Sequence, residues 1–155
     1  MPLFRELFGN ISENENITSA EVAACSLDTE RRTLDIMLSC GAYIPRNEQL
    51  ALKKSIEGIL RLNGCSLGFR FSPESFSAAV CADLTAEIKT HNAVLNGYFN
   101  DAEYLLNGDT LEITLKFGGL ASIEESGYEK ELIRLIRERF NRTVDLWFVG
   151  QTEDI

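Results

Sequence analysis

Apolar and polar residues alternate from Thr110 to Phe117, the pattern of a strand with one buried face. The pair Asn107-Gly108 precedes this strand and favours a two-residue hairpin turn, because both residue types tolerate positive φ values. We therefore predict a hairpin whose first strand comes from residues 101–106. The inward-facing residues expected on its second strand are Leu111, Ile113, Leu115 and Phe117.

The spacing of apolar residues becomes helical after Gly118 and Gly119, and one amphipathic helix is expected to run to about Phe140. Residues 143–149 then alternate again and predict a closing strand. The second half of the chain is thus predicted to be hairpin, helix and strand. The helix residues expected to face the sheet are Tyr128, Leu132, Ile136 and Phe140.

The first half shows the same order of patterns. We expect elements in the order strand 17–27, turn, strand 32–40, helix 46–63 and strand 65–71. Asn63-Gly64 is expected to cap the helix. The predicted buried positions are Leu34, Ile36, Leu38 and Cys40 on the second strand, Leu52, Ile56, Ile59 and Leu60 on the helix, and Cys65, Leu67, Phe69 and Phe71 on the third strand.

Two segments flank this first unit. Residues 2–8 predict a short helix that either docks on the core, which we favour, or forms a detachable partner-binding peptide, and 10–16 reads as a polar connector. Residues 72–75 predict a link to a helix over 76–91, capped by Ser72 or Ser75. The expected fold is α+β, with two small hairpin-helix-strand units in tandem at 1–72 and 73–155.

The order of helix, hairpin, helix and strand from Phe76 to Val149 resembles a type II KH-like fold. The nucleic-acid-binding version of that fold clamps the backbone with a G-x-x-G loop. No two glycines in this chain are three positions apart, so the usual RNA-binding device is missing.

The net charge of the chain indicates which class of partner to expect. The chain of 155 residues has 15 Lys and Arg against 24 Asp and Glu, a net charge of −9. A domain this acidic repels nucleic acid unless its basic residues gather on one face, so a protein partner is expected first. The sequence has no apolar run of about 18 residues and no signal-peptide pattern at its start, so we expect no membrane span and a cytoplasmic location.

Residues with catalytic or metal-binding chemistry are scattered. Cys25, Cys40, Cys65 and Cys81 are far apart without a C-x-x-C pair, and we expect four reduced, mostly buried thiols. His91 is the only histidine and is interpreted as a helix-end or surface residue. Neither a P-loop nor a dinucleotide-binding glycine motif occurs. We therefore expect a non-enzymatic domain with no cofactor and no metal.

Two features are candidates for partner binding. Lys130, Arg134 and Arg137 share the side of the predicted helix opposite its apolar face. This basic strip is interpreted as a solvated face with intrahelical ion pairs, the alternative being a site for phosphate or acidic groups. Trp147 is out of phase with the apolar positions of the last strand. It either packs under a second layer or is an exposed contact residue.

The whole chain resembles the N-terminal region of the PolC-type DNA polymerase III alpha subunit of low-GC Gram-positive bacteria. The resemblance is carried by residues 17–38 with Arg31-Arg32-Thr33-Leu34 at the turn, Cys65-Ser66-Leu67-Gly68-Phe69-Arg70-Phe71, Leu95-Asn96-Gly97-Tyr98-Phe99, Leu111-Glu112-Ile113-Thr114-Leu115 and residues 128–140.

That resemblance implies a non-catalytic fragment of a replicative DNA polymerase with 3'-5' exonuclease activity. An OB domain and the polymerase, exonuclease and histidinol-phosphatase-like parts are expected further along the full-length protein. The implied role is docking to replisome proteins, with the clamp-loader tau subunit as partner. The alternative function is single-stranded nucleic-acid binding by a KH-like domain through the basic strip.

Overall fold

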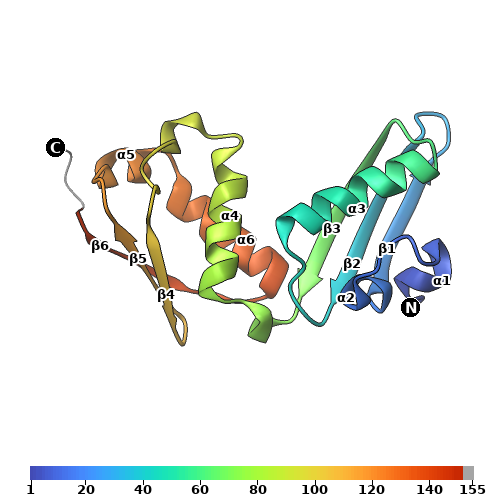
Figure 1. Cartoon of the computed structure of the whole chain (residues 1–155), viewed down its shortest axis with the longest axis horizontal. Helices are drawn as coiled ribbons and strands as arrows, with labels where there is room; N and C mark the ends of the chain where they lie inside the picture. Colours follow the sequence, from blue (N-terminus) through green and yellow to red (C-terminus); the bar gives the residue numbers. More distant parts are fainter. Residues whose placement is uncertain (152–155) are drawn as a thin grey trace. The chain divides into compact units, whose positions relative to one another are not determined.

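The computed structural model describes residues 1–151. The chain is a mixed α+β protein with two three-stranded sheets, so the predicted fold class is confirmed at this level. It divides between Ser75 and Phe76 into two compact units, each with its own sheet and helices (Figure 1). The sequence-based boundary between 72 and 73 lies just before this point.

The first unit contains one sheet in the order β1-β2-β3, with β1 and β2 antiparallel and β2 and β3 parallel. The helix between β2 and β3 makes the crossover that a parallel pair requires. The elements are α1 (Phe4–Phe8), α2 (Glu15–Thr18), β1 (Glu21–Asp28), β2 (Thr33–Cys40), α3 (Arg46–Ile59) and β3 (Gly64–Phe71).

The core of the first unit lies between the sheet and its helices. All four predicted inward residues of β2 are buried, and Leu52 and Ile56 of α3 are buried with them. The prediction for Ile59 and Leu60 is wrong, since they are 60% and 45% exposed. The helix ends at Ile59, and Arg61 turns the chain with a φ of 53°. The predicted glycine cap is therefore wrong too, because Gly64 already pairs with β2 as the first residue of β3.

The amino-terminal helix α1 is docked, as favoured from the sequence. Phe4 is fully buried, and its amide donates to the Ala20 carbonyl at 2.8 Å. The predicted connector and the early strand start are wrong, because α2 occupies part of both segments and β1 begins only at Glu21. Asn14 starts α2, since its side chain accepts a hydrogen bond from the Asn16 amide.

The second unit contains a sheet in the order β4-β5-β6, again with an antiparallel pair followed by a parallel pair. Asn107 pairs with Thr110, so the hairpin has a two-residue loop as predicted, but this loop consists of Gly108 and Asp109. The predicted place of Asn107 in the turn is wrong, because Asn107 is the last residue of β4 and the positive φ belongs to Gly108, at 59°. The elements are α4 (Ala78–Lys89), β4 (Glu103–Asn107), β5 (Thr110–Leu115), α5 (Leu120–Glu125), α6 (Tyr128–Phe140) and β6 (Asp145–Gly150).

The helices of the second unit differ from the prediction at two points. The long helix is divided into α5 and α6 at Gly127, whose φ of 81° does not continue a right-handed helix. Ser77, not Ser72 or Ser75, caps α4 by accepting from the Val80 amide. The other two serines are used in the preceding turn, where the Ser72 hydroxyl donates to the Gly41 carbonyl and the Ser75 hydroxyl to the Ser72 carbonyl.

The core of the second unit follows the predicted faces. The four residues at four-residue spacing on α6, which are Tyr128, Leu132, Ile136 and Phe140, are fully buried, as is Ile113 on β5. The predicted inward position of Phe117 is wrong, because β5 ends at Leu115 and Phe117 is 53% exposed. One face of this sheet is therefore closed by helices.

A small polar cluster is enclosed in this core. The Thr85 hydroxyl donates to the Cys81 carbonyl at 2.9 Å and lies 2.7 Å from the Tyr128 hydroxyl. Burial raises the pKa of the Cys81 thiol to about 12 and that of the Tyr128 phenol well above its usual range. Burial also raises the pKa of Tyr104 to about 12 and, in the first unit, that of Cys40 to about 12. These groups are therefore uncharged in the folded protein at neutral pH.

We expect the free energy of unfolding to fall as the pH rises above about 9. Exposed thiols and phenols lose their protons near about 8.5 and 10, whereas the buried ones hold theirs to higher pH. Because the unfolded chain then binds fewer protons than the native one, stability present at neutral pH is lost with increasing pH. Urea denaturation at pH values from about 7 to 11 measures this. Cys81→Ala should flatten the loss, and equal stability at both ends of the range would contradict the prediction.

Candidate interaction surface

The basic strip on α6 is exposed but largely occupied by its own helix. Arg134 donates to Glu131 through Nε at 3.3 Å and to Glu138 through Nη1 at 2.8 Å. The hydrogen bond from Arg134 lowers the pKa of Glu131, and its carboxylate partners raise the pKa of the Arg134 guanidinium. Lys130 and Arg137 are exposed and form no ion pair within residues 1–151. Only two of the three predicted residues thus keep an unpaired charge in this part of the chain.

Two neighbouring arginines have structural roles inside the second unit. Arg139 forms a bidentate pair with Glu87 of α4, at 3.0 and 2.7 Å, which ties α6 to α4. Arg142 donates through Nε to the carboxylate of Asp109 at 2.9 Å, and its guanidinium lies over the ring of Phe76. These two cations add little to a basic surface.

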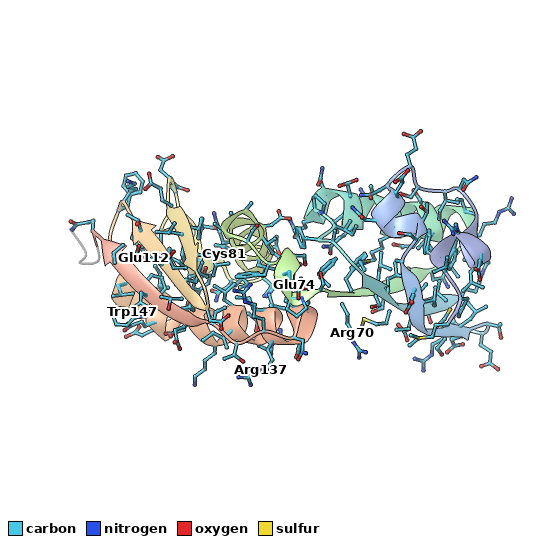
Figure 2. All side chains as sticks on the ribbon, turned by 90° about the horizontal axis from the view of Figure 1, so that it is seen from below. Arg70, Glu74, Cys81, Glu112, Arg137 and Trp147 are labelled. Atoms are coloured by element: carbon cyan, nitrogen blue, oxygen red, sulfur yellow. The ribbon has the colours of Figure 1, made fainter. Side chains whose placement is uncertain are left out.

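Trp147 lies on another element, β6, on the sheet face that points away from the helices described for this unit. Figure 2 shows Trp147 on β6 and Arg137 on α6 as separate positions. Of the two alternatives for Trp147, the structure supports the exposed one, because the residue is 62% exposed and packs under no second layer of its unit. The predicted site residues are therefore not brought together in one site.

The strand register places Trp147 in a row with two residues that the sequence did not single out. Glu112 on the central strand β5 is paired directly with Leu105 on β4 and with Trp147 on β6. Directly paired residues point to the same face, and Glu112 points away from the helices because its neighbours Leu111 and Ile113 are buried. Leu105 is 52% exposed. The row is thus apolar, acidic and aromatic.

Adjoining pairs extend this row into a surface, here called the outer sheet face. Lys116 pairs with Glu103 at 3.5 Å, whereas Glu112 and Asp145 form no ion pair within residues 1–151. The surface therefore carries carboxylates that no neighbouring cation neutralises. By strand register its members are Glu103, Leu105, Asn107, Thr110, Glu112, Thr114, Asp145, Trp147 and Val149.

Only part of this surface can be predicted from the sequence. Alternation around Ile113 already directs Glu112 to the polar face, but no local pattern shows which residues of β4 and β6 lie beside it. That depends on the register of two strand pairs, one of them parallel and separated from β5 by two helices.

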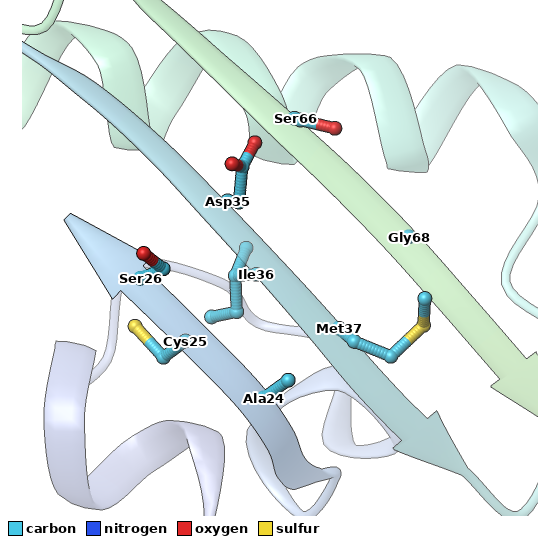
Figure 3. Close-up of a pocket in the computed structure, with 8 residues that line it drawn as sticks. All are labelled: Ala24, Cys25, Ser26, Asp35, Ile36, Met37, Ser66 and Gly68. Carbon is cyan, nitrogen blue, oxygen red and sulfur yellow. The ribbon is translucent and has the colours of Figure 1, made fainter. Parts of the chain in front are cut away.

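The first unit has a shallow hollow of about 340 Å³ on its sheet. Figure 3 shows the Asp35 and Met37 side chains directed toward β3, where Ser66 and Gly68 lie. A Cβ atom on Gly68 would come within 2.7 Å of Met37 Cε, so the absence of a side chain at Gly68 leaves room for the Met37 side chain. The lining has one carboxylate and neither histidine nor lysine, so it offers no acid-base pair. The lining residues are Ala24, Cys25, Ser26, Asp35, Ile36, Met37, Ser66 and Gly68.

Other reactive groups are dispersed through residues 1–151. No cluster of three or more His, Cys, Asp or Glu side chains suited to a metal ion occurs in this range. The prediction that most thiols are buried and reduced is confirmed, since all four are free and only Cys25 is exposed. His91 is exposed just beyond α4, as predicted for a helix-end or surface residue.

No helix between residues 1 and 151 has the length and apolar character needed to cross a bilayer. Comparisons of the chain with protein-family models, with curated proteins and with solved structures gave no match.

Proposed function

We propose that this chain is a non-catalytic docking module of a PolC-type replicative DNA polymerase. It joins the polymerase to a replisome protein, and the resemblance of the sequence implies the clamp-loader tau subunit as that partner. The observation that carries the docking role is the outer sheet face, where Trp147 and Leu105 are 62% and 52% exposed. Large exposed apolar side chains on a rigid sheet add nothing to the folded core and suit a protein contact.

The topology of the second unit supports a type II KH-like fold as part of this proposal. It runs from helix α4 through the antiparallel pair β4-β5 and the helices α5 and α6 to the parallel strand β6. A G-x-x-G loop is absent from the sequence. A KH-like unit without this loop is suited to protein contacts rather than to clamping a nucleic-acid backbone.

Single-stranded nucleic-acid binding through the basic strip is the second candidate, and it has weaker support. Lys130 and Arg137 offer two unpaired cations, but the charge of Arg134 is shared with Glu131 and Glu138. Phosphate contacts need several cations that release counterions, and the chain as a whole carries a net charge of −9. Binding of this kind would weaken steeply with salt.

Calorimetric titration of the chain with a clamp-loader tau subunit tests the docking role. We expect a saturable interaction with a Kd of micromolar or below, since the apolar anchors and the acidic groups would be buried together. A single-stranded oligonucleotide at low salt serves as the control and should bind far more weakly. Absence of any heat of binding with tau at tens of micromolar would contradict the docking proposal, and tight, salt-sensitive oligonucleotide binding would favour the second candidate.

A further inference from the structure

We propose that the outer sheet face receives a basic, Lys- or Arg-containing segment of the partner protein, with one cation seated on the Trp147 indole beside the Glu112 carboxylate. This inference rests on the proposed docking function and identifies the chemistry of the segment that docks. The occupant is a segment of a protein, and binding of nucleic acid or of an acidic peptide at this face would contradict it.

The central row of the outer sheet face places an aromatic ring beside a carboxylate. Glu112 has Trp147 on one side and Leu105 on the other, as its direct partners in the two strand pairs. Neighbouring strands lie about 5 Å apart, so the indole and the carboxylate are close enough to contact the same ligand group. A cation over an indole is attracted by the ring face, and a carboxylate beside it adds a charge-assisted hydrogen bond.

The charges around this row leave two carboxylates without a cationic partner among the described residues. Two cations that flank the strands of this face are already engaged: Lys116, just after β5, pairs with Glu103, and Arg142, before β6, pairs with Asp109. Glu112 and Asp145 have no ion pair with any described residue, and Glu112 is half-buried in the middle of the sheet. A purely apolar partner would cover this carboxylate without replacing its water, which is costly. A partner with Lys or Arg supplies the missing charge.

The apolar neighbours indicate how the rest of the segment binds. Leu105 in the central row and Val149 in the next strand pair lie on the two edge strands, at exposed and half-buried positions respectively. The methylene stems of Lys and Arg pack on such side chains while the charged end reaches a carboxylate. A segment that mixes basic and apolar residues therefore fits this face better than either kind alone.

The fluorescence of Trp147 provides a direct measurement, because it is the only tryptophan in the chain. The probe is a short synthetic peptide with Lys and Leu residues in a Gly-Ser background, and the matched peptide has Glu in place of every Lys. We expect the basic peptide to change the Trp147 emission in a saturable way that weakens with salt. The acidic peptide should leave the emission unchanged. Equal binding of both peptides would overturn the proposal.

Variants locate the binding on this face. Glu112→Gln should weaken the basic peptide by about threefold to tenfold, because it removes the unpaired carboxylate. Glu125→Gln removes an exposed carboxylate from α5 instead and is the matched control, with an expected change below about twofold. Trp147→Ala, measured by calorimetry, should weaken binding by about tenfold or more. Equal losses for Glu112→Gln and Glu125→Gln would show only a general charge effect and overturn the site.

The same variants with the tau subunit separate the two proposals. If tau binds the unchanged chain and neither Trp147→Ala nor Glu112→Gln alters its Kd, docking stands and the outer sheet face is not its site. If tau does not bind but the basic peptide binds with the expected dependence on Glu112, the surface stands and the proposed function fails. Unchanged melting temperatures of the variants exclude unfolding as the cause of any loss.

Discussion

Ile136→Ala should lower the free energy of unfolding of the second unit by about 2–5 kcal/mol. Ile136 is fully buried on α6, in the helix face that also contains the buried residues Leu132 and Phe140. Alanine removes methyl and methylene groups from this packed face and leaves a cavity that rigid neighbours fill only in part. Urea or guanidinium denaturation followed by circular dichroism measures the loss.

Arg137→Ala is the matched control for this prediction, one position further along the same helix. Arg137 is exposed and has no ion pair within residues 1–151, so its truncation should cost less than about 0.5 kcal/mol. The two variants differ only slightly in helix propensity, since both place alanine in the middle of α6. A larger loss for Arg137→Ala than for Ile136→Ala would mean that the faces of α6 are assigned wrongly.

Gly119→Ala should destabilise the second unit by about 2–4 kcal/mol. Gly119 precedes α5 with a φ of 87°, a left-handed conformation that costs a residue with a Cβ atom about 1–2 kcal/mol. A Cβ atom there would also overlap the ring of Tyr98, closest to Cδ1 and at 2.5 Å from Cε1. Thermal and chemical denaturation of the variant measure the sum of the two effects.

Gly127→Ala separates these two effects. Gly127 precedes α6 with nearly the same backbone, a φ of 81°, but a Cβ atom there would meet no other atom within 4 Å. Only the conformational cost of about 1–2 kcal/mol should remain. Equal losses for Gly119→Ala and Gly127→Ala would mean that Tyr98 moves aside without cost and that the packing on Gly119 adds nothing to stability.

The buried residues around Ile136 and the proposed docking residues lie on opposite sides of the sheet of the second unit. Ile113 of β5 points into the core beneath the helices, while its neighbour Glu112 points to the outer sheet face. The core therefore fixes the positions of Glu112 and Trp147 without using their side chains. For this reason, substitutions on the outer face should change binding and leave the melting temperature nearly unchanged, whereas Ile136→Ala should do the reverse.

The sequence by itself determined the elements whose signals are local. Alternation identified β2 and β5 with their buried residues, and Asn107-Gly108 identified the hairpin to within one residue, since its loop is Gly108-Asp109. The four-residue spacing from Tyr128 to Phe140 identified the buried face of α6. These predictions succeed because the side-chain period of a strand or helix follows from its own backbone and requires no knowledge of distant residues.

Only the tertiary structure decided where the helices end and which side chains of different strands lie side by side. Gly127 divides one predicted helix into two, and the end of α3 leaves Ile59 exposed although its spacing predicts burial. The row of Leu105, Glu112 and Trp147 arises only when β5 pairs with both of its neighbours in this register. A shift by one residue would turn the side chains of an edge strand to the opposite face. The outer sheet face therefore depends on pairing between distant segments, which the pattern within each strand does not encode.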